Sequence, residues 1–298
     1  MSADLFPGFA SHWIDTDEGR IFARSGGNPR AEPLLLLHGF PQSHLMWARM
    51  AGELAKRFHV VAMDLRGYGW SSAPRSTNGE TYSKRAMGED VVHVMQKLGH
   101  VRFRIVGHDR GARLGYRLAL DHPGRVEKLA LLDILPTIEV WRNIRAGTTP
   151  AAHWAFLSQP DPVPETEIAR IGANSYFEGL MQAWTQDHSL RAFSVAALSE
   201  YRNAWGDSSR IHAFCEDYRA GAQQDLAADE ADLAARRTIE APVCVLSGSF
   251  FLTAGLRPAL DVWRETFAPK AIGAQINSGH FLAEENAPDT LTALLAFL

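Results

Sequence analysis

The sequence predicts an α/β protein with a mostly parallel sheet that is flanked by helices and interrupted by a helical insertion. Two observations support this fold class. Short apolar runs alternate with helix-like stretches over residues 1–136 and again over residues 238–298. Residues 137–237, in contrast, hold aromatic and helical stretches with little strand signal. We therefore expect a core made of residues 1–136 and 238–298, with residues 137–237 forming a helical cap, or lid.

The expected strands follow one another along the chain. The first two flank a turn at Asp17–Gly19 and suggest a hairpin. The later runs are mainly apolar, as expected of strands that are buried on both faces of a sheet. The expected strands are His12–Asp15, Ile21–Arg24, Leu34–Leu37, His59–Met63, Phe103–Val106, Leu129–Leu132, Val243–Leu246 and Ala271–Ile276.

Helical patterns separate these strands. In a parallel sheet all strands present their carboxyl ends at one edge, which is the usual place of chemistry in open α/β folds. Reactive residues are therefore expected just after the strands. The expected helices are Tyr82–Leu98, Ala112–Leu120, Ala192–Trp205, Pro258–Phe267 and a final helix from Pro288.

The composition is that of an ordinary globular protein, with 298 residues, 46% apolar, 21% charged and a net charge of -4. No long basic run is present, so nucleic acid and anionic membranes are not expected partners. The first ten residues lack the pattern of a signal peptide, and no apolar run reaches transmembrane length. Cys215 and Cys244 are too few for a disulfide framework or a zinc site. We expect a cytoplasmic protein with both thiols reduced in packed regions.

The most informative motif is Gly-His-Asp-Arg-Gly at residues 107–111. It lies between an expected strand and an expected helix, as the nucleophile elbow of G-x-S-x-G enzymes does, but Asp109 takes the place of serine. A carboxylate needs no base to act as a nucleophile, and it can attack an sp3 carbon to form an alkyl-enzyme ester. Hydrolysis of that ester then needs a histidine base. By itself the motif is weak, because an aspartate also caps helices.

Three further features follow expected strands. His280 comes after the last strand and is the candidate base, and Asp133 is the candidate acid that orients it. The turn His38–Pro41 places the Phe40 amide where, with the Arg110 amide, it can stabilise an oxyanion. Each has a simpler interpretation as a turn or a structural side chain. Their joint order, with each feature after its own strand, favours a catalytic site.

At this point the chain resembles the α/β-hydrolase family over nearly its whole length, which implies the α/β-hydrolase fold with an inserted cap. Family members with an aspartate nucleophile include epoxide hydrolases, haloalkane dehalogenases and fluoroacetate dehalogenases. Haloalkane dehalogenases usually carry tryptophan directly after the nucleophile, where this chain has Arg110. An apolar haloalkane would leave that buried guanidinium unpaired, at a cost of several kcal/mol.

The segment Asp109–Arg113 is similar to the Asp-Arg-x-x-Arg segment of fluoroacetate dehalogenases. Arg110 and Arg113 lie one helical turn apart and can bind a substrate carboxylate together. The alternative is that Arg113 lies on a solvated helix face. The resemblance also implies a halide site formed by His153, Trp154 and Tyr218, whose neutral N–H and O–H groups suit a small halide. As isolated aromatic residues these three would more often be packing residues of the lid.

The leading hypothesis is hydrolytic dehalogenation of a small 2-haloacid, with fluoroacetate as the expected substrate and no metal or organic cofactor. The alternative is an epoxide hydrolase with the same nucleophile and base, in which Tyr218 and either Tyr176 or Tyr201 protonate the epoxide oxygen. A third hypothesis is a non-catalytic binding protein of the same fold. The resemblance implies a homodimer. The bulky segment Ser247–Leu252 has no assigned role.

Overall fold

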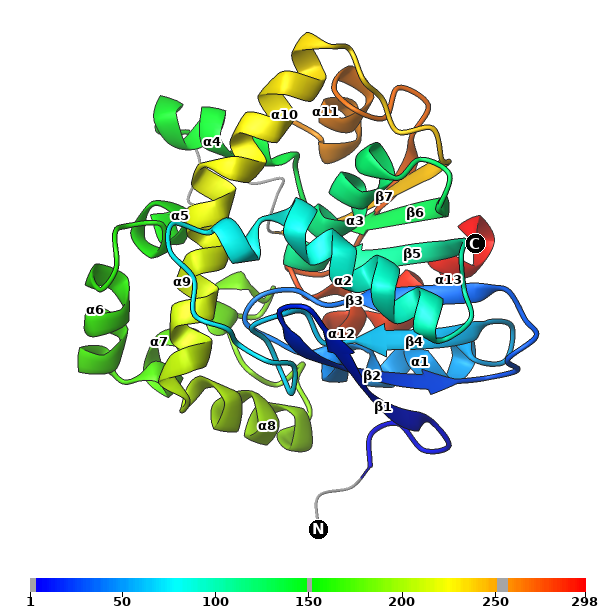
Figure 1. Cartoon of the computed structure of the whole chain (residues 1–298), viewed down its shortest axis with the longest axis horizontal. Helices are drawn as coiled ribbons and strands as arrows, with labels where there is room; N and C mark the ends of the chain where they lie inside the picture. The colour runs from blue at the N-terminus through cyan, green and yellow to red at the C-terminus, as the bar shows by residue number, and fades with distance from the viewer. Residues whose placement is uncertain (1–3, 149–151, 251–256) are drawn as a thin grey trace.

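The computed structural model describes residues 4–148, 152–250 and 257–298. Eight strands in these residues form one sheet in the order β1-β2-β4-β3-β5-β6-β7-β8 (Figure 1). β1 and β2 form an antiparallel hairpin, β2 pairs antiparallel with β4, and all later pairs are parallel. The strands are β1 (Ala10–Thr16), β2 (Gly19–Gly26), β3 (Pro33–Leu37), β4 (His59–Met63), β5 (Phe103–His108), β6 (Val126–Leu132), β7 (Val243–Gly248) and β8 (Ile272–Ile276). The predicted mostly parallel sheet and its opening hairpin are thus confirmed.

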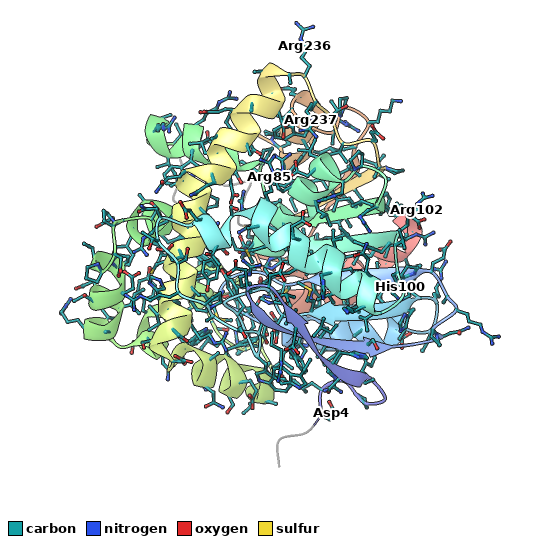
Figure 2. The ribbon with its side chains drawn as sticks, in the orientation of Figure 1. Asp4, Arg85, His100, Arg102, Arg236 and Arg237 are labelled. Atoms are coloured by element: carbon teal, nitrogen blue, oxygen red, sulfur yellow. The ribbon has the colours of Figure 1, made fainter. Side chains whose placement is uncertain are left out.

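Helices cover both faces of this sheet. Figure 1 shows α2 and α3 on the near face, with α1, α12 and α13 behind. Leu34–Leu37 at the sheet centre are fully buried, as the apolar runs predict. Charged side chains such as Arg102 and Arg236 point outward at the periphery (Figure 2). The core helices are α1 (Ala48–Leu54), α2 (Lys84–Lys97), α3 (Asp109–Asp121), α11 (Ala259–Glu265), α12 (Leu282–Glu285) and α13 (Ala287–Phe297).

A helical region is inserted between β6 and β7, as predicted. It lies beside the sheet, on the left in Figure 1, and the long helix α9 runs through its middle. We call this region the cap. Its helices are α4 (Thr137–Ala146), α5 (Ala152–Leu157), α6 (Val163–Ile171), α7 (Ala173–Trp184), α8 (Val195–Trp205), α9 (Ser208–Ala222) and α10 (Gln224–Ala234).

Helix starts differ from the sequence predictions where side-chain caps decide them. α2 begins after Ser83, whose hydroxyl accepts a hydrogen bond from the Ala86 amide, and α8 begins after Ser194 in the same way. The difference that matters most for function is at α3, which begins at Asp109 and not at Ala112. The proposed nucleophile is therefore itself the first residue of the helix.

No helix in the described part of the chain has both the length and the apolar character needed to cross a bilayer. Cys215 and Cys244 are both free and buried, as predicted. Burial raises the pKa of the Cys244 thiol to about 11, so it stays protonated at neutral pH.

Candidate active site

Asp109 lies in a sharp turn between β5 and α3. Its φ is +44°, in the left-handed region that residues with a side chain rarely adopt. Glycines make the turn possible: a Cβ on Gly107 would lie 2.6 Å from the Cα of Ala112, and one on Gly111 would lie 2.4 Å from the carbonyl oxygen of Leu37. The strand-to-helix elbow predicted from residues 107–111 is therefore present.

The loop after β3 packs directly against Asp109. The Phe40 amide donates a hydrogen bond of 2.9 Å to Asp109 Oδ1. A Cβ on Gly39 would come within 2.5 Å of the Asp109 Cβ, so this approach requires glycine. The second expected donor, the Arg110 amide, lies in the first turn of α3, where amides have no intrahelical acceptor. The Phe40 amide thus contacts the carboxylate directly, and the Arg110 amide follows it in the chain.

His280 and Asp133 form a hydrogen-bonded pair. His280 Nδ1 lies 2.7 Å from Asp133 Oδ2, and Asp133 Oδ1 accepts a 2.8 Å hydrogen bond from the Gly248 amide. The Asp133 amide in turn donates to the Leu246 carbonyl at 2.8 Å. The end of β7 therefore fixes the carboxylate, and the carboxylate fixes the imidazole with its proton on Nδ1.

This hydrogen bond gives a role to part of the segment Ser247–Leu252, to which the sequence assigns none. Gly248 belongs to β7, and Ser247 is buried, whereas Phe250 is exposed. Residues 251 and 252 lie outside the described residues.

Neighbouring charges set the ionisation of Asp109 and His280. Burial alone would raise the pKa of Asp109, but the charges of His280, Arg110 and Arg113 hold it well below its usual value. Asp109 is therefore an anion at neutral pH. Burial lowers the pKa of His280, but its hydrogen bond to Asp133 and the charge of that carboxylate outweigh this and raise it.

The two arginines of α3 are buried, with Arg110 0% and Arg113 4% exposed. Arg113 therefore does not lie on a solvated face. Its Nη1 donates to the Leu135 carbonyl at 2.9 Å and to Thr137 Oγ1 at 3.2 Å. Among the described residues, Arg110 Nε, Arg110 Nη2 and Arg113 Nε have no hydrogen-bond acceptor. Buried donors of this kind are costly unless an acceptor is bound, so they suit an anionic ligand.

Aromatic residues of the cap pack on these arginines. The Trp154 ring lies 4.4 Å from the Cζ of both Arg110 and Arg113, and the Tyr218 ring lies 3.4 Å from that of Arg110. His153 and Trp154 each contact Tyr218, with ring centroids 5.6 and 5.5 Å apart. The three residues expected at a halide site therefore come together beside the arginines.

These three side chains keep neutral donors. Burial lowers the pKa of His153 to about 3, so the imidazole is neutral at physiological pH. Burial raises the pKa of Tyr218 well above its usual value, and its phenol stays protonated. His153, Trp154 and Tyr218 therefore offer N–H and O–H donors but add no positive charge beside the arginines.

Comparison with known proteins assigns this architecture to a family. A model of the α/β-hydrolase fold matches residues 32–266. The chain belongs to the α/β-hydrolase family.

This α/β hydrolase is 41% identical to a fluoroacetate dehalogenase from Burkholderia sp, over 99% of this chain and 95% of the relative. It is 31% identical to a soluble epoxide hydrolase from Corynebacterium sp. (strain C12), over 89% of each. The solved structure of ALR0039 from Nostoc sp PCC 7120 matches with a TM-score of 0.91 and 46% identity, over 97% of both chains. The resemblance inferred from the sequence is confirmed. The relatives of this chain include both a fluoroacetate dehalogenase and an epoxide hydrolase.

Sequence reasoning missed Trp184 of this α/β hydrolase. Its ring centroid lies 4.6 Å from that of His153 and 5.6 Å from that of His280, and its carbonyl accepts the His280 amide at 2.9 Å. His108 was also missed, and its Nε2 lies 2.8 Å from the His280 carbonyl. Trp184 connects the cap to the histidine loop, a contact that no local motif could have indicated.

The tyrosines of the epoxide alternative lie in different surroundings. Tyr218 contacts Arg110. The Tyr201 hydroxyl instead accepts a 3.3 Å hydrogen bond from Gln42, and Tyr176 packs against Phe177 with centroids 5.2 Å apart. Only one of the three candidate tyrosines is therefore found in the described contacts around Asp109 and its arginines.

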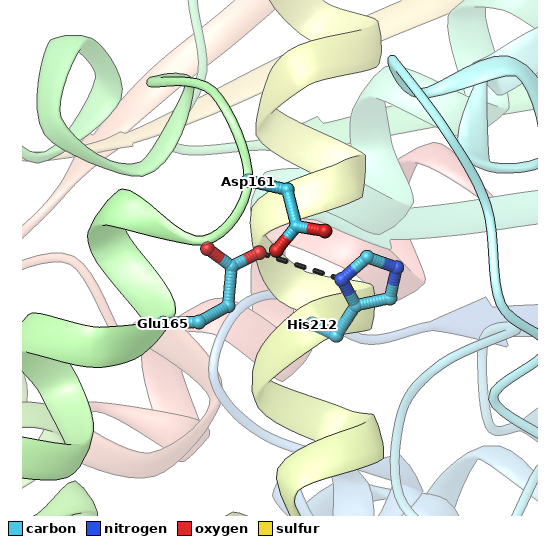
Figure 3. A group of neighbouring side chains, drawn as sticks. All are labelled: Asp161, Glu165 and His212. Atoms are coloured by element: carbon cyan, nitrogen blue, oxygen red, sulfur yellow. Dashed lines mark ion pairs between the residues drawn. The ribbon is translucent and has the colours of Figure 1, made fainter.

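A separate group of metal-type ligands lies in the cap, away from this site. Asp161, Glu165 and His212 bring one ligand atom each within 4.8 Å of one another (Figure 3). Arg219 Nη1 and Nη2 already lie 2.8 and 3.0 Å from the two oxygens of Glu165, and His212 Nδ1 lies 3.4 Å from one of them. Arg75 lies 3.9 Å from Asp161. Because arginine charges already balance these carboxylates, the group is better described as an ion-pair network.

Proposed function

We propose that this α/β hydrolase is a hydrolytic dehalogenase of small 2-haloacids that converts fluoroacetate and water to glycolate and halide. The observation that carries the proposal is the pair of buried guanidinium groups beside Asp109, with N–H groups that lack acceptors among the described residues. A substrate carboxylate would supply those acceptors in charge-assisted hydrogen bonds. The fluoroacetate dehalogenase at 41% identity supports the same substrate class.

In the first step, Asp109 attacks the halogen-bearing carbon. The Phe40 amide holds Oδ1, so Oδ2 is the attacking oxygen. Arg110 and Arg113 bind the carboxylate of the substrate and thereby fix the direction of attack. A bond forms between Oδ2 and the carbon, and the carbon–halogen bond breaks with its electron pair leaving on the halide.

The departing halide is received by His153, Trp154 and Tyr218. Fluoride is a poor leaving group. Hydrogen bonds that strengthen as negative charge develops on it therefore lower its displacement barrier more than that of a better leaving halide. Neutral donors suit this role, because a permanently charged donor would also bind the halide product tightly. The low pKa of His153 and the raised pKa of Tyr218 support such neutral donors.

In the second step, His280 removes a proton from water, and the water oxygen attacks Cγ of the Asp109 ester. The Phe40 and Arg110 amides stabilise the negative charge that develops on Oδ1. The bond between Cγ and Oδ2 breaks, glycolate leaves with a proton from His280, and one proton is released overall. Asp133 holds the imidazole in the required tautomer. Asp109 and His280 supply the nucleophile and the base, so the route uses no metal or organic cofactor.

Epoxide hydrolysis is the competing function, supported by the epoxide hydrolase relative. It needs tyrosines that donate protons to the opening ring oxygen. Tyr201 bonds to Gln42 and Tyr176 packs in the cap, which leaves Tyr218 alone near the arginines. A neutral epoxide also gives Arg110 and Arg113 no anion. The observations therefore favour the haloacid.

A homodimer remains a prediction, which sedimentation velocity would test.

The test is release of fluoride and chloride from fluoroacetate and chloroacetate, with the Asp109→Ala protein as the control. We expect both halides from the wild type and neither from the variant. Chloride release alone would retain the mechanism but remove the assistance to fluoride by His153, Trp154 and Tyr218. If neither halide is released while an epoxide panel is hydrolysed, the competing function is correct. If the wild type binds a haloacid without turnover, and Asp109→Ala binds it equally well, the chain is a binding protein.

A further inference from the structure

Helix α9 of the cap presents three residues to Arg110. Asp217 Oδ1 lies 3.4 Å from Arg110 Nη1, and the Tyr218 ring lies 3.4 Å from its Cζ. Gly221 follows Asp217 by four residues, so both lie on the same helix face. The Arg110 guanidinium therefore lies next to the Asp217 carboxylate, the Tyr218 ring and Gly221, which has no side chain.

The lack of a side chain at Gly221 is what leaves room for the guanidinium. A Cβ there would lie 3.2 Å from Arg110 Nη1 and 3.6 Å from Trp154 Cζ3. The backbone of Gly221 does not adopt a positive φ, so its conformation is open to any residue. Glycine is a poor helix former, and the turn would be more stable with alanine. The close approach of Arg110 accounts for glycine at this position.

Arg110 has little freedom to yield to a larger residue. The Trp154 ring lies 4.4 Å from its Cζ, and Asp217 accepts a hydrogen bond from its Nη1. The helix is also restrained, because Trp141 Nε1 donates a 2.8 Å hydrogen bond to the Gly221 carbonyl. A methyl group at 221 would therefore shift the guanidinium by a few tenths of an ångström.

We propose that Gly221 is a positioning residue that determines specificity for carboxylate ligands. Because Gly221 has no side chain, Arg110 packs against α9 in a position from which its Nε and Nη2 can bind the carboxylate together with Arg113. This inference deepens the proposed function and takes the identity of the ligand from it. It also assigns part of the substrate specificity to the cap, although both arginines belong to the core.

The test compares Gly221→Ala with Gly179→Ala. Gly179 lies in helix α7 of the cap, and a Cβ there would meet nothing within 4 Å. Both changes replace a helical glycine by alanine, so both should keep or raise the melting temperature. Only Gly221→Ala should disturb Arg110. Acetate serves as a ligand that cannot react, and acetamide as its neutral counterpart.

We expect Gly221→Ala to weaken acetate binding, measured by calorimetry, about tenfold, the size expected when a charge-assisted hydrogen bond is misaligned. Gly179→Ala should bind acetate as the wild type does, and acetamide affinity should be the same in all three proteins. With chloroacetate, KM should rise by a similar factor in Gly221→Ala and by more than kcat falls.

Equal acetate affinity in the wild type and Gly221→Ala would overturn the inference, as would a loss that accompanies a lower melting temperature. The proposed function is tested separately by halide release from the wild type. If the wild type releases no halide but Gly221→Ala still loses acetate affinity selectively, the positioning role stands and the dehalogenase fails. Halide release with no effect of Gly221→Ala on acetate or KM would support the dehalogenase and refute the positioning role.

Discussion

His280 Nδ1 and Asp133 Oδ2 lie 2.7 Å apart, although 147 residues separate them in the chain. The strand order brings them together, because β6 ends next to Asp133, β7 lies beside it, and the loop after β8 carries His280. The whole cap is inserted between the two residues. Residues at the ends of core strands therefore hold this pair, while the cap contributes His153, Trp154 and Tyr218 to the site.

Replacing Asp133 by asparagine should slow ester hydrolysis while leaving ester formation largely intact. An amide can donate to Nδ1 and favour the wrong tautomer, and in serine hydrolases the equivalent change costs about 10⁴-fold. We expect a burst of about one halide per active site followed by very slow turnover, measured by rapid-quench halide assay. Asp261 is the matched control, since it lies on helix α11 and outside this pair. Asp261→Asn should turn over normally, and an unaltered steady state in Asp133→Asn would contradict the assignment.

The pH dependence of kcat should show an acidic limb set by His280. Its pKa is raised by Asp133, so the imidazole remains protonated to a higher pH than usual. Since only the neutral form accepts a proton from water, kcat should fall as the pH is lowered through this raised pKa. In Asp133→Asn the residual activity should have its limb at lower pH. Asp109 contributes no limb near neutrality, because its pKa is lowered. A limb that moves upward in Asp133→Asn would refute this explanation.

Tyrosine variants separate the two enzyme functions. Tyr218→Phe removes a proposed halide donor and should reduce fluoride release about tenfold or more, with a smaller effect on chloride, because fluoride depends more on hydrogen bonding. Tyr201→Phe removes the contacts of that hydroxyl with Gln42 and Glu284 and should leave release of both halides within about twofold. Ion-selective electrodes measure both products. Equal losses of fluoride release in the two variants would contradict the halide role of Tyr218. Equal losses of epoxide hydrolysis in the two variants would indicate paired tyrosines and favour the epoxide reaction.

Glu284 makes stability depend on pH. Burial raises the pKa of its carboxyl to about 8 from a usual value of 4.5. Between these values the folded protein holds a proton that the unfolded chain has lost, so the free energy of unfolding should fall as the pH rises through this window. Glu284→Gln should therefore melt a few degrees above the wild type at pH 8.5, with a smaller gap at pH 5. Calorimetry at both pH values checks this.

The control for that measurement is Glu53→Gln. Glu53 lies on α1 with a side chain that is 53% exposed, and its replacement should give the same difference at both pH values. A Glu284→Gln protein that melts below the wild type at pH 8.5 would show that the buried carboxylate is stabilised by its partners and not strained by burial.

The sequence was informative wherever function depends on a residue next to a strand end. Asp109, Asp133 and His280 each follow a predicted strand. Because parallel strands end at the same edge of a sheet, the sequence alone predicts that these three residues lie close together. Glycine at residue 107 likewise reports a local backbone requirement, the close approach of Ala112. These features depend on neighbours in the chain, which is why the sequence alone reveals them.

Other parts of the site depend on packing between distant segments. Trp184 reaches His280 from α7, and Gly248 donates to Asp133 from the next strand of the sheet. Asp217 is fully buried and bonds to core residues, yet in the sequence it is an ordinary acidic residue of a helix. Gly221 carries no sequence pattern at all. The roles of Trp184, Asp217 and Gly221 arise from the docking of the cap on the core, and that of Gly248 arises from strand pairing within the core. No local pattern encodes either.

In the proposed mechanism Asp109 carries the substrate as an ester, and the most direct test is to trap that ester. The His280→Ala protein should be incubated with chloroacetate, digested, and examined by mass spectrometry. We predict that the peptide containing Asp109 gains the mass of one carboxymethyl group, and that Asp109→Asn combined with His280→Ala shows no gain. An unmodified Asp109 peptide, under conditions in which the wild type releases chloride, would contradict the ester mechanism.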